Sequence, residues 1–320
     1  MCLVVLAFRV SADHPVILAA NRDEFHARPT REAHWWPDAG GILAGRDLLA
    51  GGTWLGVSRG GRFATVTNVR DATEPTDRPE SRGRLVAEFL SGDQQPLDYL
   101  CAIDTDAYSG FNLLAGDEHC VAYTSNRGGG VRELPPGLYG LSNATLDTPW
   151  EKVQRSKSRL ADIVASGVTS DAALLQLLAD SDRGPAGEVR DDDLPFEIAH
   201  ALTAPFIVTP DYGTRCSTVV RVEAGGRWHF HERRFGRGQV VAGRLRELQL
   251  QGLVGVGVRQ RGAAPSAAFD RDRHRAGADR RRRADDARRP GARLVADRRG
   301  GAGAGPHDCA LRALQLTGRG

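Results

Sequence analysis

The chain opens with two apolar segments separated by a short polar break, and this pattern constrains its fold more than any other feature. Residues 3–10 (LVVLAFRV) and residues 16–20 (VILAA) are rich in aliphatic side chains, so both predict buried strands. The break at residues 11–14 (SADH) is short enough to connect two antiparallel strands. The sequence therefore predicts an N-terminal β-hairpin.

The expected pairing of this hairpin brings charged residues to the start of the chain. If Val10 lies opposite Pro15, counting back along the ladder puts Cys2 opposite Asp23, with Arg22 next to it. A carboxylate there would hold an α-ammonium group, and an arginine would depress a thiol pKa and orient a substrate carbonyl. An ordinary surface ion pair at the end of a hairpin is the alternative.

Cys2 becomes the N-terminal residue if the initiator Met1 is removed. One residue would then carry a thiol and a free α-amino group, which is one way to activate a nucleophile with an adjacent base. Their ordinary pKa values, about 8.5 for the thiol and about 7.7–8.0 for the amine, both lie near physiological pH. The alternative is that Cys2 simply begins the first strand as a small apolar residue.

Composition favours a cytoplasmic protein without a membrane span. No apolar stretch of the 320 residues reaches the length of a transmembrane helix, and the first apolar segment has no basic residues before it and no cleavage site after it. The cysteines are odd in number and contain no C-x-x-C pair, which argues against a disulfide framework and a zinc knuckle. They are Cys2, Cys101, Cys120, Cys216 and Cys309.

Charge divides the chain into a domain at residues 1–250 and a tail at residues 251–320. The tail holds 16 Arg and 7 Asp with neither Lys nor Glu, which leaves 27 basic and 33 acidic residues in the domain. With few large apolar residues, the tail is expected to be disordered. An RNA- or membrane-binding arm is disfavoured because Phe269 is its one aromatic residue. Translation in a shifted reading frame past the end of the domain explains the composition better, and no nucleic-acid partner is expected.

Hairpins and blocks of helices alternate through the domain. Strand pairs are expected on either side of the glycine-containing turns at residues 58–61 and 223–226. Helices are expected to begin at Ser81, at Thr148 with Pro149 in the first turn, and at Ser170. This order predicts an α+β fold with antiparallel sheets. The polar residues 182–195 are expected to form an exposed loop, with a lid as one interpretation.

A set of short motifs resembles the NRDE family, also called the transport and Golgi organization protein 2 family. The resemblance runs in order through residues 1–247 and leaves the tail without a counterpart. Cys216 stands where the family commonly has Ser. The motifs are Met1-Cys2, Asn21-Arg22-Asp23-Glu24-Phe25, Arg28-Pro29-Thr30, Gly51-Gly52-Thr53-Trp54-Leu55-Gly56, Thr67-Asn68-Val69-Arg70, Ser81-Arg82-Gly83, Gly110-Phe111-Asn112-Leu113-Leu114, Tyr139-Gly140-Leu141-Ser142-Asn143, Leu146-Asp147-Thr148-Pro149-Trp150 and Tyr212-Gly213-Thr214-Arg215.

This resemblance implies the four-layer αββα fold of N-terminal nucleophile hydrolases, with a more distant similarity to the cholylglycine hydrolase and penicillin V acylase group. It implies Cys2 as the nucleophile and Asn143 as a residue that stabilises the transition state or holds the amine. An amide side chain aimed at a developing oxyanion lowers the barrier by about 3 kcal/mol. Alternatively, each Asn bonds its own backbone at a turn, and Arg215 forms a structural ion pair. The implied catalytic residues are Cys2, Arg22, Asp23, Asn68 as an oxyanion-hole donor, Asn143, and Arg215 as a cation beside the thiolate.

Two functions are compatible with these residues. The first is an N-terminal-cysteine amidohydrolase whose small-molecule amide substrate and oligomeric state the sequence does not specify. The second, implied by the family, is a haem or lipid carrier that keeps the fold without catalysis. No cofactor or metal is expected. The glycines lack phosphate-binding spacing, Asp191-Asp192-Asp193 predicts a solvated loop, and four histidines predict surface or strand-face positions; these are His26, His34, His229 and His231.

Overall fold

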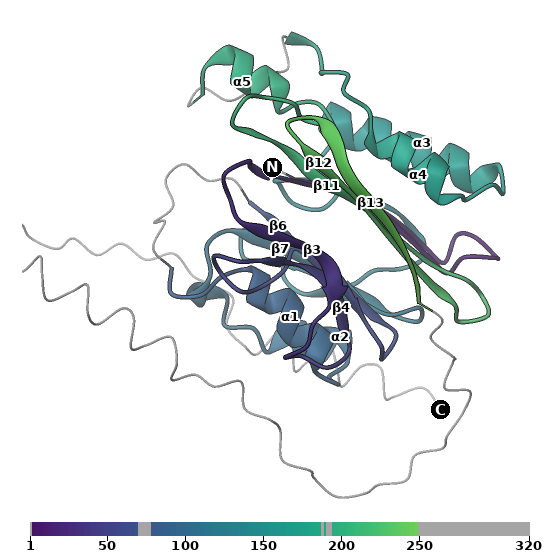
Figure 1. Ribbon diagram of the computed structural model, residues 1–320. Helices are drawn as coiled ribbons and strands as arrows, with labels where there is room; N and C mark the ends of the chain where they lie inside the picture. Colours follow the sequence, from purple (N-terminus) through teal and green to yellow (C-terminus); the bar gives the residue numbers. More distant parts are fainter. Residues whose placement is uncertain (1, 70–77, 187–188, 190–193, 249–320) are drawn as a thin grey trace, which may run out of the picture. The chain divides into compact units, whose positions relative to one another are not determined.

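The computed structural model describes residues 2–69, 78–186, 189 and 194–248, and Figure 1 shows their arrangement. The predicted tail at residues 251–320 lies outside the described residues. The described strands form a six-stranded sheet in the order β10-β1-β2-β11-β12-β13 and a seven-stranded sheet in the order β3-β4-β5-β6-β7-β8-β9. Neighbouring strands in both sheets are antiparallel, as predicted.

Both sheets are built from consecutive hairpins, with β10 and β11 inserted next to the first hairpin. The six-stranded sheet consists of β1 (Cys2–Phe8), β2 (Val16–Phe25), β10 (Gly137–Leu141), β11 (Tyr212–Val222), β12 (Trp228–Gly236) and β13 (Gln239–Leu248). The seven-stranded sheet consists of β3 (Thr30–Trp35), β4 (Ile42–Asp47), β5 (Leu55–Ser58), β6 (Arg62–Asn68), β7 (Phe111–Gly116), β8 (Val121–Ser125) and β9 (Arg132–Glu133).

Helices cover the outer face of each sheet. Helices α1 (Gly83–Ser91) and α2 (Pro96–Cys101) pack on the seven-stranded sheet, and a short 3-10 helix η1 (Thr105–Ala107) follows them. Helices α3 (Glu151–Ala165) and α4 (Asp171–Leu178) pack on the six-stranded sheet, and α5 (Phe196–Ala201) lies on the same side (Figure 1). A third apolar core fills the space between the sheets. The predicted four-layer αββα arrangement is therefore confirmed.

Strand β1 is buried on both faces, which explains its nearly continuous apolar sequence. Val4, Leu6 and Phe8 point into the core between the sheets, whereas Leu3 and Val5 point toward the helices. Because side chains alternate along a strand, Cys2 belongs to the face between the sheets.

The predicted pairing of the first hairpin is wrong by one residue. Cys2 lies opposite Arg22, and the backbone N–H of Arg9 donates to the carbonyl of Pro15. Arg9 adopts a left-handed conformation with φ of 50°, so the loop takes five residues instead of four. A one-residue shift exchanges the two faces of a strand. Asp23 therefore lies on the helix-covered face, while Arg22 shares the inter-sheet face with Cys2.

Helix boundaries also differ from the expected ones at two of three places. Helix α1 begins after Arg82 and α3 begins after Trp150, and neither receives a side-chain cap from Ser81 or Thr148. The cap at Ser170 is confirmed, because its hydroxyl accepts a hydrogen bond from the N–H of Ala173 at 3.2 Å. Much of the expected loop at residues 182–195, including Asp191-Asp192-Asp193, lies outside the described residues. In the described part of the chain, none of the helices is long and apolar enough to cross a membrane.

Candidate functional site

Cys2 is clamped through its backbone by the two residues that follow β10. Its N–H donates to Oδ1 of Asn143 at 2.9 Å, and its carbonyl accepts from the hydroxyl of Ser142 at 2.6 Å. Strand β10 pairs with β1, so the residues after β10 emerge beside the start of β1. The sheet topology therefore joins Cys2 to a residue 141 positions away in the sequence.

Asn143 connects the two sheets at this point. Its side chain is buried, and its amide Nδ2 donates to the carbonyl of Asn68 at 2.7 Å. Asn68 ends β6 of the other sheet, and its own side chain is exposed. The structure thus brings Cys2, Asn143 and Asn68 together, although Asn68 contributes its backbone to the contact. Its predicted use as an oxyanion-hole donor remains a prediction.

A buried hydrogen-bond chain supports this clamp from the seven-stranded sheet. Thr67 donates to the carbonyl of Ser142 at 2.7 Å and accepts from the amide of Asn112 at 3.1 Å. Tyr123 donates to Oδ1 of Asn112 at 2.8 Å. Fully satisfied polar networks of this kind rigidify their surroundings. Asn112 had no predicted role, although a polar residue inside an apolar strand was the available signal.

Arg22 extends from the position opposite Cys2 into the space between the sheets. Its side chain is only 6% exposed, and its guanidinium lies over the ring of Trp54 at 4.3 Å. Thr30 and Asp47 lie within 3.4 and 3.5 Å of its nitrogens. Stacking and charge pairing compensate for the burial of this cation.

Asp23 lies close to Cys2 but on the helix-covered side of the sheet. Its Oδ1 accepts a hydrogen bond from the hydroxyl of Thr214 at 2.6 Å, and its Oδ2 is buried and has no hydrogen-bond partner among the described residues. Burial raises the pKa of the Asp23 carboxyl, whereas the nearby Lys152 and the Thr214 hydrogen bond act in the opposite direction. The backbone of Asp23 also acts on Cys2, because it lowers the pKa of the thiol.

The surroundings of Cys2 shift the pKa of its thiol in opposite directions. Burial raises its pKa most strongly, and the negative charge of Asp23 adds to this effect. The Asp23 backbone N–H and the positive charge of Arg22 lower the pKa. Its protonation state therefore depends on the charges that neighbouring elements bring to it.

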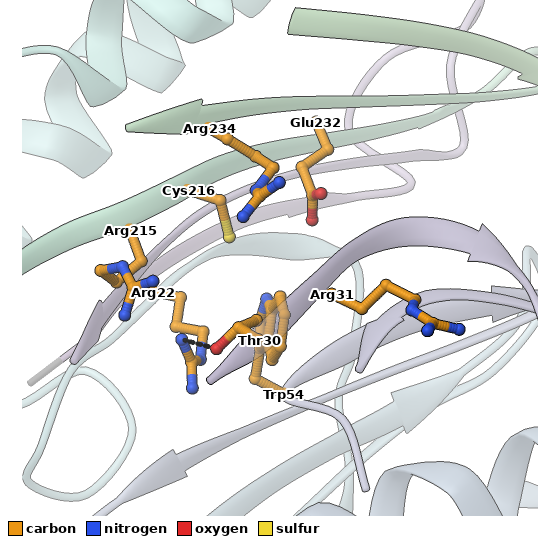
Figure 2. Close-up of a pocket in the computed structure, with 8 residues that line it drawn as sticks. All are labelled: Arg22, Thr30, Arg31, Trp54, Arg215, Cys216, Glu232 and Arg234. Atoms are coloured by element: carbon orange, nitrogen blue, oxygen red, sulfur yellow. Dashed lines mark hydrogen bonds between the residues drawn. The ribbon is translucent and has the colours of Figure 1, made fainter. Parts of the chain in front are cut away.

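Arg215 is near this site but is bound elsewhere. Its guanidinium donates to the carbonyls of Phe25 and Arg28 at 2.6 and 3.2 Å, and a β-bulge in β11 lies between Thr214 and Cys216. Figure 2 shows it lining a pocket next to Arg22. The structure therefore makes Arg215 a pocket-lining residue, and its predicted contact with a thiolate at Cys2 is not among the described interactions.

The pocket in Figure 2 lies between the sheets, and four of its eight lining residues are basic. Cys216 lies opposite Arg22 in the sheet, so Arg22 on β2 has Cys2 beside it on β1 and Cys216 beside it on β11. Glu232 is buried, and burial raises the pKa of its carboxyl. The basic side chains are Arg22, Arg31, Arg215 and Arg234.

Lys152 is a residue near the site that the sequence analysis missed. It lies in the first turn of α3, is only 3% exposed, and donates from Nζ to the carbonyl of Leu202 at 3.0 Å. Burial lowers the pKa of its ammonium group, while Asp23 and Cys2 raise it. The available signal was a lysine on the same helix face as the apolar residues Val153 and Leu160.

The histidines do not gather into a metal site in the described residues. His26 contacts the carbonyl of Thr209, and His34 contacts the carbonyl of Glu32. His229 and His231 lie beside carboxylates of Glu223 and Asp171. No group of three or more potential ligands forms within the described residues. Carriage of haem or lipid remains a prediction.

Solved structures with a similar fold include two hydrolases. One is a Caenorhabditis elegans N-acylethanolamine-hydrolyzing acid amidase (NAAA) ortholog, with a TM-score of 0.43 and 12% identity over 68% of this chain and 92% of that chain. The other is the C2A mutant of a conjugated bile acid hydrolase from Clostridium perfringens, with a TM-score of 0.43 and 9% identity over 79% and 94% of the two chains. Likenesses of this size do not bear on the chemistry of this chain.

Sequence relatives are much closer. The Transport and Golgi organization protein 2 homolog of Bos taurus is 40% identical over 73% of this chain and 92% of its own length. The Homo sapiens homolog is 36% identical over the same shares, and the Drosophila melanogaster protein is 31% identical over 68% and 86%. The sequence profile of the Transport and Golgi organisation 2 family matches residues 1–237. The chain therefore belongs to the Transport and Golgi organisation 2 family.

Proposed function

We propose that this protein is an amidohydrolase that uses Cys2 as an N-terminal nucleophile after removal of Met1. The observation that carries the proposal is the clamp on Cys2, whose nitrogen is held by Asn143 and whose carbonyl is held by Ser142. A residue that only begins a strand has no need of two buried side chains that hold its backbone. Once Met1 is removed, the same nitrogen becomes the α-amino group that serves as the base.

The proposed reaction begins with transfer of the thiol proton to the α-amino group of Cys2. The thiolate then attacks the amide carbonyl, forming a C–S bond and a tetrahedral oxyanion. The C–N bond breaks as the α-ammonium returns the proton to the departing amine, which leaves a thioester on Cys2. Water hydrolyses the thioester, releasing the acid and restoring the thiol.

Neighbouring residues have distinct roles in this proposal. Asn143 holds the amine, because its Oδ1 already accepts from the Cys2 nitrogen and its Nδ2 is occupied by Asn68. The Asn68 side chain, exposed at the end of β6, is then assigned to the oxyanion. Arg22 and Arg215 supply positive charge at the adjoining pocket, and Asp23 acts through its backbone N–H and its charge.

The test is mass spectrometry followed by turnover of a panel of N-acyl amides. We expect the intact protein to lack Met1 and to gain the mass of the acyl group during turnover. Cys2→Ser and Cys2→Ala should both lose activity by at least about 10³-fold, the scale on which removal of a nucleophile reduces catalysis. Cys101→Ala, which changes an exposed cysteine on α2, is the matched control and should remain active. Unchanged turnover by Cys2→Ala would refute the proposal.

A further inference from the structure

Behind the six-stranded sheet, a short chain segment ties α3 to the strand that carries Asp23. Residues 202–207 follow α5, and the segment begins where the carbonyl of Leu202 accepts a hydrogen bond from Lys152 at 3.0 Å. It ends where the N–H of Ile207 donates to the hydroxyl of Thr214 at 2.9 Å. The same hydroxyl donates to Asp23 at 2.6 Å. The segment therefore links Lys152 to Asp23 through three hydrogen bonds.

The middle of this segment is also held against β2. Asn21, two residues before Asp23 and on the same face of the strand, donates from Nδ2 to the carbonyls of Pro205 and Leu178 at 2.8 and 2.9 Å. Its Oδ1 accepts from the hydroxyl of Ser217 at 2.6 Å. Lys152 and Asp23 thus belong to one buried polar layer between the sheet and its helices.

Within this layer, Lys152 and Asp23 are both buried, and their side chains are linked through the segment at residues 202–207. Lys152 is 3% exposed and Asp23 is 5% exposed, and burying either charge alone would cost several kcal/mol. Oδ2 of Asp23 also lacks a hydrogen-bond partner among the described residues. Of the other charges in the first two turns of α3, Glu151 and Arg155 pair with each other at 2.6 Å, and Lys157 pairs with Asp147 at 2.6 Å. Lys152 is the charge of α3 that acts on Asp23, and each of the two favours the charged form of the other.

We propose that Lys152 is a positioning residue, which anchors residues 202–207 and supplies the positive charge that balances Asp23 behind the nucleophile Cys2. The inference rests on the proposed function, because it treats Cys2 as the nucleophile. The ionisable groups that act on Cys2 are the N-terminal amino group, Arg22 and Asp23 from β2 and Lys152 from α3, and the Cys2 and Cys216 thiols act on each other. Of these, Lys152 and Asp23 lie on the helix side of the sheet.

The test is the pH profile of Cys2 alkylation by iodoacetamide, followed on the N-terminal peptide by mass spectrometry. The thiolate is the form that reacts, and a positive charge favours it. Removing that charge with Lys152→Met should move the profile to higher pH and slow alkylation at pH 7 by about threefold to tenfold. Lys152→Arg keeps the charge and should restore the wild-type profile.

The matched control is Lys157→Met, which removes a lysine one and a half turns further along α3. Lys157 pairs with Asp147 at 2.6 Å and is 28% exposed, so its loss should leave the profile unchanged. A folded Lys152→Met protein with the wild-type profile would overturn the inference and leave the proposed function intact. If instead Cys2→Ala still cleaved amides, the proposed function would fail whatever the profile of Lys152→Met.

A second measurement covers the case in which Lys152→Met does not fold. Asp23→Asn removes the negative charge that balances Lys152, and Lys152→Met removes the positive charge that balances Asp23. The double variant removes both buried charges, so it should fold under conditions in which Lys152→Met alone does not. If the double variant is as unfolded as Lys152→Met, the two charges do not balance each other and the inference is wrong.

Discussion

Replacing Asn143 with alanine is the most direct perturbation of the clamp on Cys2. The substitution removes the acceptor of the Cys2 N–H at 2.9 Å and the donor to the Asn68 carbonyl at 2.7 Å. The two partly buried hydrogen bonds contribute about 0.5–1.5 kcal/mol each, and a partly buried N–H left without a partner costs about 1 kcal/mol more, the low end for such a group. We therefore expect the free energy of unfolding to fall by about 2–4 kcal/mol.

The assay has two readouts. A loss of this size lowers the melting temperature of a domain of about 250 residues by roughly 4–16 °C. The rate of Cys2 alkylation at fixed pH should also change, because the nitrogen next to the thiol loses its fixed position. Both measurements use the purified full chain and need no substrate.

Asn126→Ala is the matched control for this experiment. Asn126 also accepts from a backbone N–H, that of Phe111 at 2.8 Å, and donates to the carbonyl of Tyr108 at 3.1 Å, but it lies outside the site. Its replacement should reduce stability similarly and leave Cys2 alkylation unchanged. An Asn143→Ala protein that matches the wild type in both readouts would refute the assignment of Asn143 to the clamp.

Two further predictions concern stability. Burial opposes ionisation of Asp171, but hydrogen bonding and charge from His231 and Arg221 lower its pKa to about 2, below the unfolded value near 3.9. The stabilisation from this ionised carboxylate is complete above about pH 5 and is lost as pH falls toward 2. Asp171→Asn should therefore lower the free energy of unfolding by about 2 kcal/mol at pH 7, and urea unfolding of the variant should show a smaller loss of stability toward low pH. An unchanged loss of stability toward low pH would contradict this prediction. A Cβ at Gly45 would overlap the Trp54 ring, so Gly45→Ala should lower stability by about 1–3 kcal/mol in thermal unfolding, and an unchanged melting temperature would show that the ring has room to move.

Short sequence patterns predicted the strands and the helix cap that depend on residues close together in the sequence. The apolar segments at residues 3–10 and 16–20 predicted β1 and β2 because strands buried on both faces need continuous apolar sequence. The cap at Ser170 was predicted because a hydroxyl satisfies an unpaired N–H at a helix start regardless of its surroundings. The motif resemblance predicted the layered fold, and it contained Cys2 and Asn143, which the structure brings together.

Tertiary structure decided what depends on one residue of register or on distant segments. The left-handed conformation of Arg9 lengthens the first loop, and this single step places Arg22 instead of Asp23 opposite Cys2. The loop composition is compatible with either length, and only packing of both faces of β2 selects between them. Lys152 is linked to Asp23 through residues 202–207, a segment that follows Asp23 by more than 175 residues in the sequence. The sequence by itself determined which elements form and which family the chain resembles, whereas long-range packing determined which charges surround Cys2.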